Sequence, residues 1–311
     1  MCIGNFDGVH RGHARMLAAG RRIAVERNRP FVIMTFDPHP MNILKPAAPR
    51  PPLMTLEQRL EALESFSPDA VVLYRTNAEL LDMTAEAFMA GVLREQFAVS
   101  CLVEGANFTF GKGAAGTVDT LMENAARFGW KAMVVPTQEA ALADQTLVNV
   151  SSSLIRWLVG HGRMQDAAVL LGRPFTLRGQ VEQGDRRGRL LGYPTVNLQT
   201  SQLIPADGVY GGWAVTAGTV CQAAVSIGTN PTFQGQQRRV EAFLLDFDQD
   251  LYGRTVDLAF AMFVRDQQVF ADAEALRRQI AHDVRKISDV LKARNMSSFP
   301  PGPPTAAAVN V

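Results

Sequence analysis

The stretch Gly4-Asn5-Phe6-Asp7-Gly8-Val9-His10-Arg11-Gly12-His13 is the most informative part of the chain. The apolar residues Met1-Cys2-Ile3 come before it, and an amphipathic stretch that carries Met16, Leu17, Ile23 and Ala24 follows it. This order predicts a strand, a glycine-bearing turn and the start of a helix. Such a turn places backbone N–H groups at the positive end of a helix, where phosphates bind well.

The glycines and histidines of this turn suit phosphate chemistry. Glycines let the backbone approach a ligand closely, and imidazoles donate hydrogen bonds to phosphoryl oxygens as negative charge builds in a transition state. A tight turn with two incidental surface histidines is the alternative, but two of the chain's five histidines lie here. We therefore expect catalytic roles for His10 and His13, and phosphate contacts from Gly4, Phe6, Asp7, Gly8 and Gly12.

Between residues 30 and 136, short apolar runs alternate with longer amphipathic stretches. Alternation of this kind indicates βαβ units and a parallel sheet that is covered on both faces. We expect strands at 31–36, 69–74, 99–104 and 131–136, and helices at 57–66, 84–97 and 117–129.

A helical pair at 152–160 and 164–171 precedes a change of pattern at Gly172-Arg173-Pro174. Residues 175–264 then form short β-rich segments divided by Gly, Pro, Asn and Asp, which predict a small antiparallel barrel or sandwich. A charged helix is expected after them at 273–294. The chain is thus divided into an α/β domain at 1–172, a β domain with a C-terminal helix at 173–295, and a disordered tail at 296–311.

The composition is that of an ordinary globular protein of 311 residues, with 47% hydrophobic and 20% charged residues. The length favours two domains, and a net charge of +1 argues against a broad nucleic-acid surface. Cys2, Cys101 and Cys221 lack metal-site spacing and indicate reduced thiols in a cytoplasmic protein. Neither a membrane span nor a signal peptide is expected. The sequence leaves the oligomeric state open.

The turn GNFDGVHRGH resembles the signature of the nucleotidyltransferase superfamily and, in its GxFDGxHxGH form, that of the FAD synthetase branch. The resemblance implies a Rossmann-like fold in which the two histidines bind ATP phosphates. Three further stretches match in order, at 36–40, 104–112 and 150–156. By this resemblance Asn107, Ser152, Ser153 and Arg156 join the catalytic site, with Phe108 and Phe110 on the flavin side. Hydroxyls at a helix start with an arginine one turn inside also suit phosphate binding.

A second signal lies in residues 179–198, where a stretch rich in glycine and arginine leads into Pro194-Thr195-Val196-Asn197. Arginines beside glycines suit a mobile cover over phosphates, and an unliganded basic β-turn is the alternative. Thr195 and Asn197, in a predicted Pro-Thr-x-Asn turn, carry the hard oxygen ligands that suit Mg²⁺. We expect phosphate contacts from Gly184, Asp185, Arg187 and Gly188.

This stretch resembles the bacterial riboflavin kinase domain, which is a small antiparallel β-barrel. The match continues through 205–210 and 227–233 to a strand that carries Glu241. In that family the strand Glu is the base for the ribityl 5′-hydroxyl, a role that the resemblance gives to Glu241. Arg265 and Phe270 are the candidates for the flavin pocket.

The two resemblances imply a bifunctional enzyme that uses ATP, Mg²⁺ and flavins. Its second domain is expected to phosphorylate riboflavin to FMN, and its first to adenylylate FMN to FAD with release of pyrophosphate. The expected partners are thus the small molecules riboflavin, FMN and ATP.

Other functions stay open on the sequence alone. One is a nucleotidyltransferase for another substrate, such as phosphopantetheine, fused to an unrelated barrel. Another is a riboflavin kinase or flavin-binding protein whose adenylyltransferase half is impaired. The start of the chain bears on this second alternative, because only three residues precede Gly4. We expect that the natural protein has upstream residues that complete the first strand.

Overall fold

A parallel sheet organises the first half of the chain. The computed structural model describes residues 1–184, 188, 192–216, 218–229, 238–293 and 309–310. Two sets of parallel strands, β1–β2–β3 and β4–β7, are joined where the Val103 N–H donates to the Met1 carbonyl at 3.0 Å. The strands therefore lie in the order β3-β2-β1-β4-β7, with β1 (Cys2–Ile3), β2 (Val32–Asp37), β3 (Ala70–Arg75), β4 (Cys101–Gly105) and β7 (Lys131–Val135).

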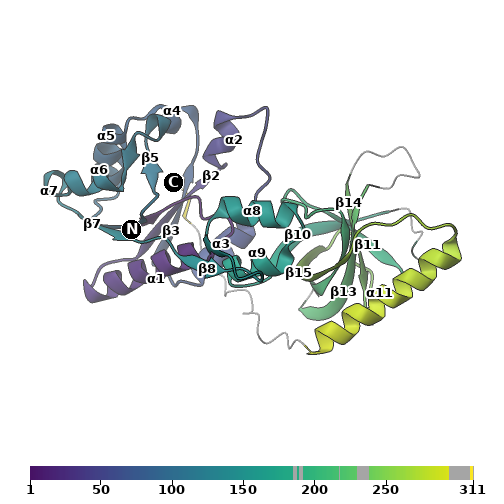
Figure 1. Cartoon of the computed structure of the whole chain (residues 1–311). Coiled ribbons are helices and arrows are strands. Elements are labelled where there is room, and N and C mark those ends of the chain that lie inside the picture. Colours follow the sequence, from purple (N-terminus) through teal and green to yellow (C-terminus); the bar gives the residue numbers. More distant parts are fainter. Residues whose placement is uncertain (185–187, 189–191, 217, 230–237, 294–308, 311) are drawn as a thin grey trace.

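Helices cover both faces of this sheet (Figure 1). Successive residues of a strand point to opposite faces, so Ile33 packs in one core with α1 and α3, and Met34 packs in a second core with η1 and α6. The predicted Rossmann-like α/β domain is thus confirmed. The helices are α1 (Arg11–Glu26), α2 (Pro40–Leu44), α3 (Leu56–Glu64), α4 (Ala78–Asp82), α5 (Ala85–Ala87), η1 (Phe88–Gln96), η2 (Lys112–Ala114), α6 (Val118–Glu123) and α7 (Ala125–Phe128).

Small elements complete this half. The single helix predicted at 117–129 is divided into α6 and α7 at Asn124, whose side-chain amide donates to the Thr120 carbonyl at 3.0 Å. Two hairpins pair β5 (Thr109–Phe110) with β6 (Gly116–Thr117), and β8 (Glu139–Ala141) with β9 (Leu147–Asn149). Beside β3 runs β16 (Val309–Asn310). The rest of the predicted disordered tail, 296–308 and 311, lies outside the described residues, so the tail stays a prediction.

The second half is a closed barrel of antiparallel strands, as the sequence predicts. Its strands follow the order β10-β11-β14-β13-β12-β15. Their bounds are β10 (Phe175–Glu182), β11 (Thr195–Gln199), β12 (Gly208–Thr216), β13 (Thr219–Gly228), β14 (Arg239–Leu244) and β15 (Thr255–Arg265). The long helix α11 (Ala273–Ala293) packs Ile287 and Leu291 against the outside of the barrel beside Trp213 and Ala261.

One local prediction is wrong. The Pro-Thr-x-Asn segment was expected to be a turn, yet Thr195 to Gln199 form strand β11 between β10 and β14. The reason is that Val196 and Leu198 alternate with polar residues and pack in the barrel core. Thr195 and Asn197 therefore project from the outer face of a strand.

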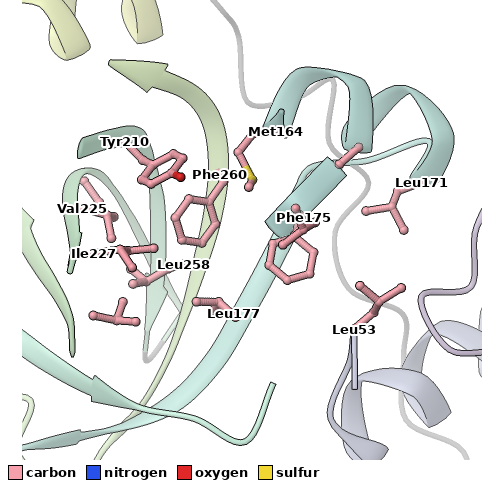
Figure 2. Close-up of a cluster of buried hydrophobic side chains, with 14 of the residues drawn as sticks. Leu53, Met164, Leu171, Phe175, Leu177, Tyr210, Val225, Ile227, Leu258 and Phe260 are labelled. Atoms are coloured by element: carbon pink, nitrogen blue, oxygen red, sulfur yellow. The ribbon is translucent and has the colours of Figure 1, made fainter. Parts of the chain in front are cut away.

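The helices α8 (Ser152–Gly160) and α9 (Met164–Leu171) connect the two halves, and their bounds are those predicted. Side chains from both halves form one hydrophobic core, in which Leu53, Met164 and Leu171 lie near Phe175 and Phe260 of the barrel (Figure 2). Polar contacts reinforce it, because Gln202 donates to the Leu53 carbonyl at 2.8 Å and Arg178 pairs with Glu61 at 2.6 Å. None of the helices in the described part of the chain is both long and apolar enough to cross a membrane.

Candidate active sites

The turn between β1 and α1 has an unusual backbone. Phe6, Gly8 and Val9 have positive φ angles of 48°, 88° and 35°. Gly8 adopts such an angle freely, whereas a β-branched residue such as Val9 does so only under strain. The surroundings must therefore hold this turn in shape.

The two histidines lie against each other at the end of the turn. Their rings stack with centroids 3.6 Å apart, and the His13 backbone N–H donates to Nδ1 of His10 at 3.2 Å, which caps helix α1. Burial lowers the pKa of His10 to about 4. It also holds the pKa of His13 well below its ordinary value, and the charge of Arg173 acts in the same direction. Both rings are neutral at pH 7, and His10 carries its proton on Nε2 because Nδ1 accepts.

Asp7 ties the turn to helix α8. Its carboxylate accepts the Leu53 N–H at 2.9 Å and forms an ion pair with Arg156, while Ser152 Oγ donates to the Asp7 carbonyl at 2.8 Å. Arg156 also donates to the carbonyl of Pro51. The side chains of Asp7 and Arg156 thus fix the position of the turn relative to α8.

A cleft of about 300 Å³ opens at the carboxyl ends of β1 and β4. This is where the order of the strands changes direction, the usual ligand position in open α/β sheets. The predicted site residues that line it are Gly4, Phe6, His10, Gly12, His13, Asn107, Phe108, Ser152 and Ser153. Four others do not line it: Asp7 and Gly8 behind the turn, Arg156 on α8, and Phe110, which packs in the core against Phe88.

A second cleft, of about 540 Å³, lies on the outside of the barrel. Glu241 of β14 pairs with Asn197 of β11 on one side and with Ser226 of β13 on the other. Directly paired residues point to the same face, and Thr195 shares that face with Asn197 because the two are separated by one residue. The barrel thus gathers a carboxylate, an amide and a hydroxyl on one outer surface.

The opposite wall of this cleft comes from α11 and the segment before it. Arg265 bonds through Nε to the buried Asp283 of α11 at 2.9 Å, and its guanidinium lies 5.7 Å from the centroid of the Phe270 ring. Arg265 and Phe270, the candidates for the flavin pocket, both line the cleft together with Leu276 and Ile280. The strand surface that carries Glu241 therefore faces a wall with both apolar side chains and the charged Arg265.

Gly188, Thr195 and Glu241 line the second cleft, whereas Gly184 and Asn197 do not. Both glycines approach polar groups of this region closely. A Cβ on Gly184 would lie 2.0 Å from Nδ2 of Asn197, and a Cβ on Gly188 would lie 2.2 Å from the Tyr193 carbonyl. Only glycine allows such close approach. Asp185 and Arg187 of the predicted phosphate cover lie outside the described residues.

The oxygens of Thr195 and Asn197 are hard donors of the kind that Mg²⁺ takes, and the face that they share with Glu241 suits a cation bridged to substrate phosphates. The part of the chain that the structure describes has no cluster of three His, Cys, Asp or Glu residues that could hold a metal by itself. A cation held mainly by substrate phosphates and water fits this donor set.

Comparisons with known proteins match each half of the chain to a family. A family model described as FAD synthetase matches residues 1–152, and one described as riboflavin kinase matches residues 171–291. The bifunctional riboflavin kinase/FMN adenylyltransferase of Escherichia coli (strain K12) is 33% identical over 285 residues, which cover 91% of this chain and 90% of that protein. The chain belongs to this bifunctional family. A second member, from Bacillus subtilis (strain 168), is 30% identical over 293 residues, and the aligned residues cover 91% of this chain and 89% of that protein.

Both halves also have a counterpart in a solved structure. A crystal structure described as a macrolide-efflux protein from Streptococcus pneumoniae matches with a TM-score of 0.82 and 29% identity, covering 93% of each chain. The combination of an α/β domain and a barrel found in this riboflavin kinase/FMN adenylyltransferase family member therefore occurs in another protein as well.

Several side chains beside the two clefts of this family member were not among the residues that the sequence predicted. Arg59 donates to the Asn5 carbonyl at 3.1 Å behind the first cleft, and Gln267 donates to Ser226 Oγ at 3.0 Å beside the second. A signal existed for two of the missed residues: Arg59 and Asp283 lie four residues before the buried Leu63 and Ile287 on their helices. A charged residue on the apolar face of a helix predicts a buried ion pair or a site residue.

Proposed function

We propose that the first cleft adenylylates FMN and the second phosphorylates riboflavin, so that the product of the second cleft is the substrate of the first. The order of the two family models along the chain supports this division, since the FAD synthetase model covers every residue that lines the first cleft except Ser153, and the riboflavin kinase model covers the second cleft. Riboflavin, FMN and ATP are the small-molecule partners. The three cysteines are free thiols, which supports a reducing, cytoplasmic environment.

In the first cleft, an oxygen of the FMN phosphate attacks the α-phosphorus of ATP, and the bond to the bridging oxygen breaks as pyrophosphate leaves. The neutral rings of His10 and His13 each keep one N–H, and they donate it to phosphoryl oxygens as charge builds there. Asn107, Ser152 and Ser153 line the same cleft and orient the two substrates. Arg156, held by Asp7, fixes α8 against the turn.

In the second cleft, Glu241 accepts the proton of the riboflavin 5′-hydroxyl, whose oxygen attacks the γ-phosphorus of ATP while ADP leaves. Thr195 and Asn197 would hold Mg²⁺, which neutralises charge on the ATP phosphates when bound. The wall with Phe270 and Arg265 receives the flavin. The single observation that carries this assignment is the register that places Glu241 opposite Asn197, because base and phosphate-side ligands must meet at one point.

A crossed pair of variants tests the division. His13→Ala should abolish FAD formation from supplied FMN and leave riboflavin phosphorylation intact. Glu241→Gln keeps the shape but removes the proton acceptor, so FMN formation should fall by ~10²-fold or more while FAD formation from FMN continues. Flavins separated by chromatography after incubation with Mg-ATP give both rates. Equal loss of the two activities in either folded variant would contradict the two-cleft assignment.

A further inference from the structure

Arg173 reaches from the start of the second half into the back of the phosphate turn. It follows Gly172, the last residue that caps α9, and precedes β10. Its partly buried guanidinium donates to the Gly8 carbonyl at 2.7 Å, to the Val9 carbonyl at 3.0 Å and to the Leu171 carbonyl at 3.3 Å. No carboxylate of the described residues forms an ion pair with it, so its charge is not neutralised locally.

Two of the three carbonyls that Arg173 binds, those of Gly8 and Val9, belong to residues with unusual backbone angles. Gly8 and Val9 have φ angles of 88° and 35°, and the strain at Val9 persists only where neighbouring groups hold it. In a trans peptide the N–H points opposite to the C=O. By fixing the Val9 carbonyl, Arg173 therefore fixes the direction of the His10 N–H on the other edge of the same peptide plane.

The cation also lies near the two histidines of the first cleft. Its charge contributes to the lowered pKa of both His10 and His13, after the larger effect of burial. The residue that supports the adenylylation turn thus comes from the segment matched by the riboflavin kinase model, residues 171–291.

We propose that Arg173 is a positioning residue for adenylyl transfer: it holds the Gly8–Val9 peptides in the geometry that the phosphate turn needs, without contacting the substrates itself. This rests on the assignment of adenylylation to the first cleft. The proposal makes the start of the kinase half a working part of the adenylyltransferase.

The full-length chain with Arg173→Ala tests this, with Arg178→Ala as the matched control. Arg178 is also a boundary arginine, but it pairs with Glu61 and Asp257 and does not touch the turn. Arg173→Ala removes both hydrogen bonds to the turn, and we expect kcat for FAD formation from FMN to fall about 10- to 100-fold, the size of effect typical of a hydrogen bond to a charged group. Riboflavin phosphorylation by the same preparation should stay within about twofold.

A chemical rescue distinguishes positioning from general stability. Added guanidinium at low millimolar concentration should restore part of the FAD formation of Arg173→Ala but not that of His13→Ala. Loss of FAD formation in both arginine variants would mean that docking of the halves matters, and the proposal would fall. It would also fall if Arg173→Ala made FAD within threefold of the natural rate, or if guanidinium gave no rescue.

A lysine variant covers the case in which the alanine variant does not fold. Arg173→Lys keeps the charge, but its single ammonium cannot match the fork that spans the Gly8 and Val9 carbonyls. An intermediate rate of FAD formation, with a normal melting temperature and normal riboflavin phosphorylation, supports the proposal. A lysine variant as active as the natural chain would overturn it. If His13→Ala left FAD formation intact, the failure would lie with the cleft assignment instead.

Discussion

The ion pair between Asp7 and Arg156 allows a quantitative test of how the first cleft is held together. The two side chains are only 7% and 18% exposed. In Asp7→Asn, the amide oxygen still accepts the Leu53 N–H, but the charge that balances Arg156 is lost. Removing one partner of a buried pair typically costs about 3–5 kcal/mol, a large share of a total stability of about 5–15 kcal/mol.

Urea unfolding of the full chain, followed by circular dichroism, measures this cost. The control is Glu26→Gln, which breaks the Arg22–Glu26 pair on the surface of α1, where the side chains are 66% and 56% exposed. That exposed pair should contribute about 0.3–0.5 kcal/mol. The double variant Asp7→Asn/Arg156→Met removes both charges and should recover part of the loss.

The activities give a second reading of the same variant. FAD formation should fall in Asp7→Asn because α8 loses its ion pair with the phosphate turn and keeps only the bond from Ser152 to the Asp7 carbonyl. Riboflavin phosphorylation below the melting temperature should be normal. An Asp7→Asn chain within about 1 kcal/mol of the natural stability, with normal FAD formation, would refute the reasoning.

Three further predictions concern other contacts. In Gly184→Ala the added Cβ would lie only 2.0 Å from the Asn197 amide nitrogen, so the rate of riboflavin phosphorylation should drop at least about tenfold by steady-state kinetics. Gly160→Ala is the control, because a Cβ at that position meets no atom within 4 Å. Phe260→Ala should lower the free energy of unfolding by about 3–5 kcal/mol in denaturant titrations. Both activities should be lost on warming, because the two halves share the core that contains Phe260. Loss of one activity alone would argue against a shared core. The folded pKa of His10 is about 4, against an ordinary 6.5, so the unfolded chain binds an extra proton between these values and stability falls as pH drops from 6.5 toward 4. His10 should contribute up to about 1.4 kcal/mol per pH unit to this slope, so the slope should decrease in His10→Gln, while His13 keeps its own contribution; an unchanged slope would contradict the prediction.

Most of the fold could be predicted because each element satisfies local rules. The expected strand at 69–74 became β3 (Ala70–Arg75), and the helix at 164–171 is α9 itself, since periodicity and end signals agree there. The strand β11 was missed because a proline and two glycines around it suggest a turn, whereas pairing with β10 and β14 decides the outcome.

The sites were predictable where a side chain lies within a compact motif, and not where it acts from afar. His10 and His13 lie three residues apart in one turn, so the motif itself brings them together. Arg173 binds backbone carbonyls 164 and 165 residues earlier in the chain. A carbonyl has no residue-specific pattern in the sequence, so nothing in the spacing could indicate that contact.

The short connection between α9 and β10 limits where the chain can be lengthened. Only three residues separate Leu171, the end of the helix, from Phe175, the start of the strand, and both side chains are seated in one core. A flexible linker or reporter domain inserted there would displace the side chain of Leu171 or of Phe175 from the core, although Gly172 and Pro174 are residue types typical of interdomain linkers. The loop at 246–250, where all but one residue are exposed, offers a better insertion point for a fluorescent label.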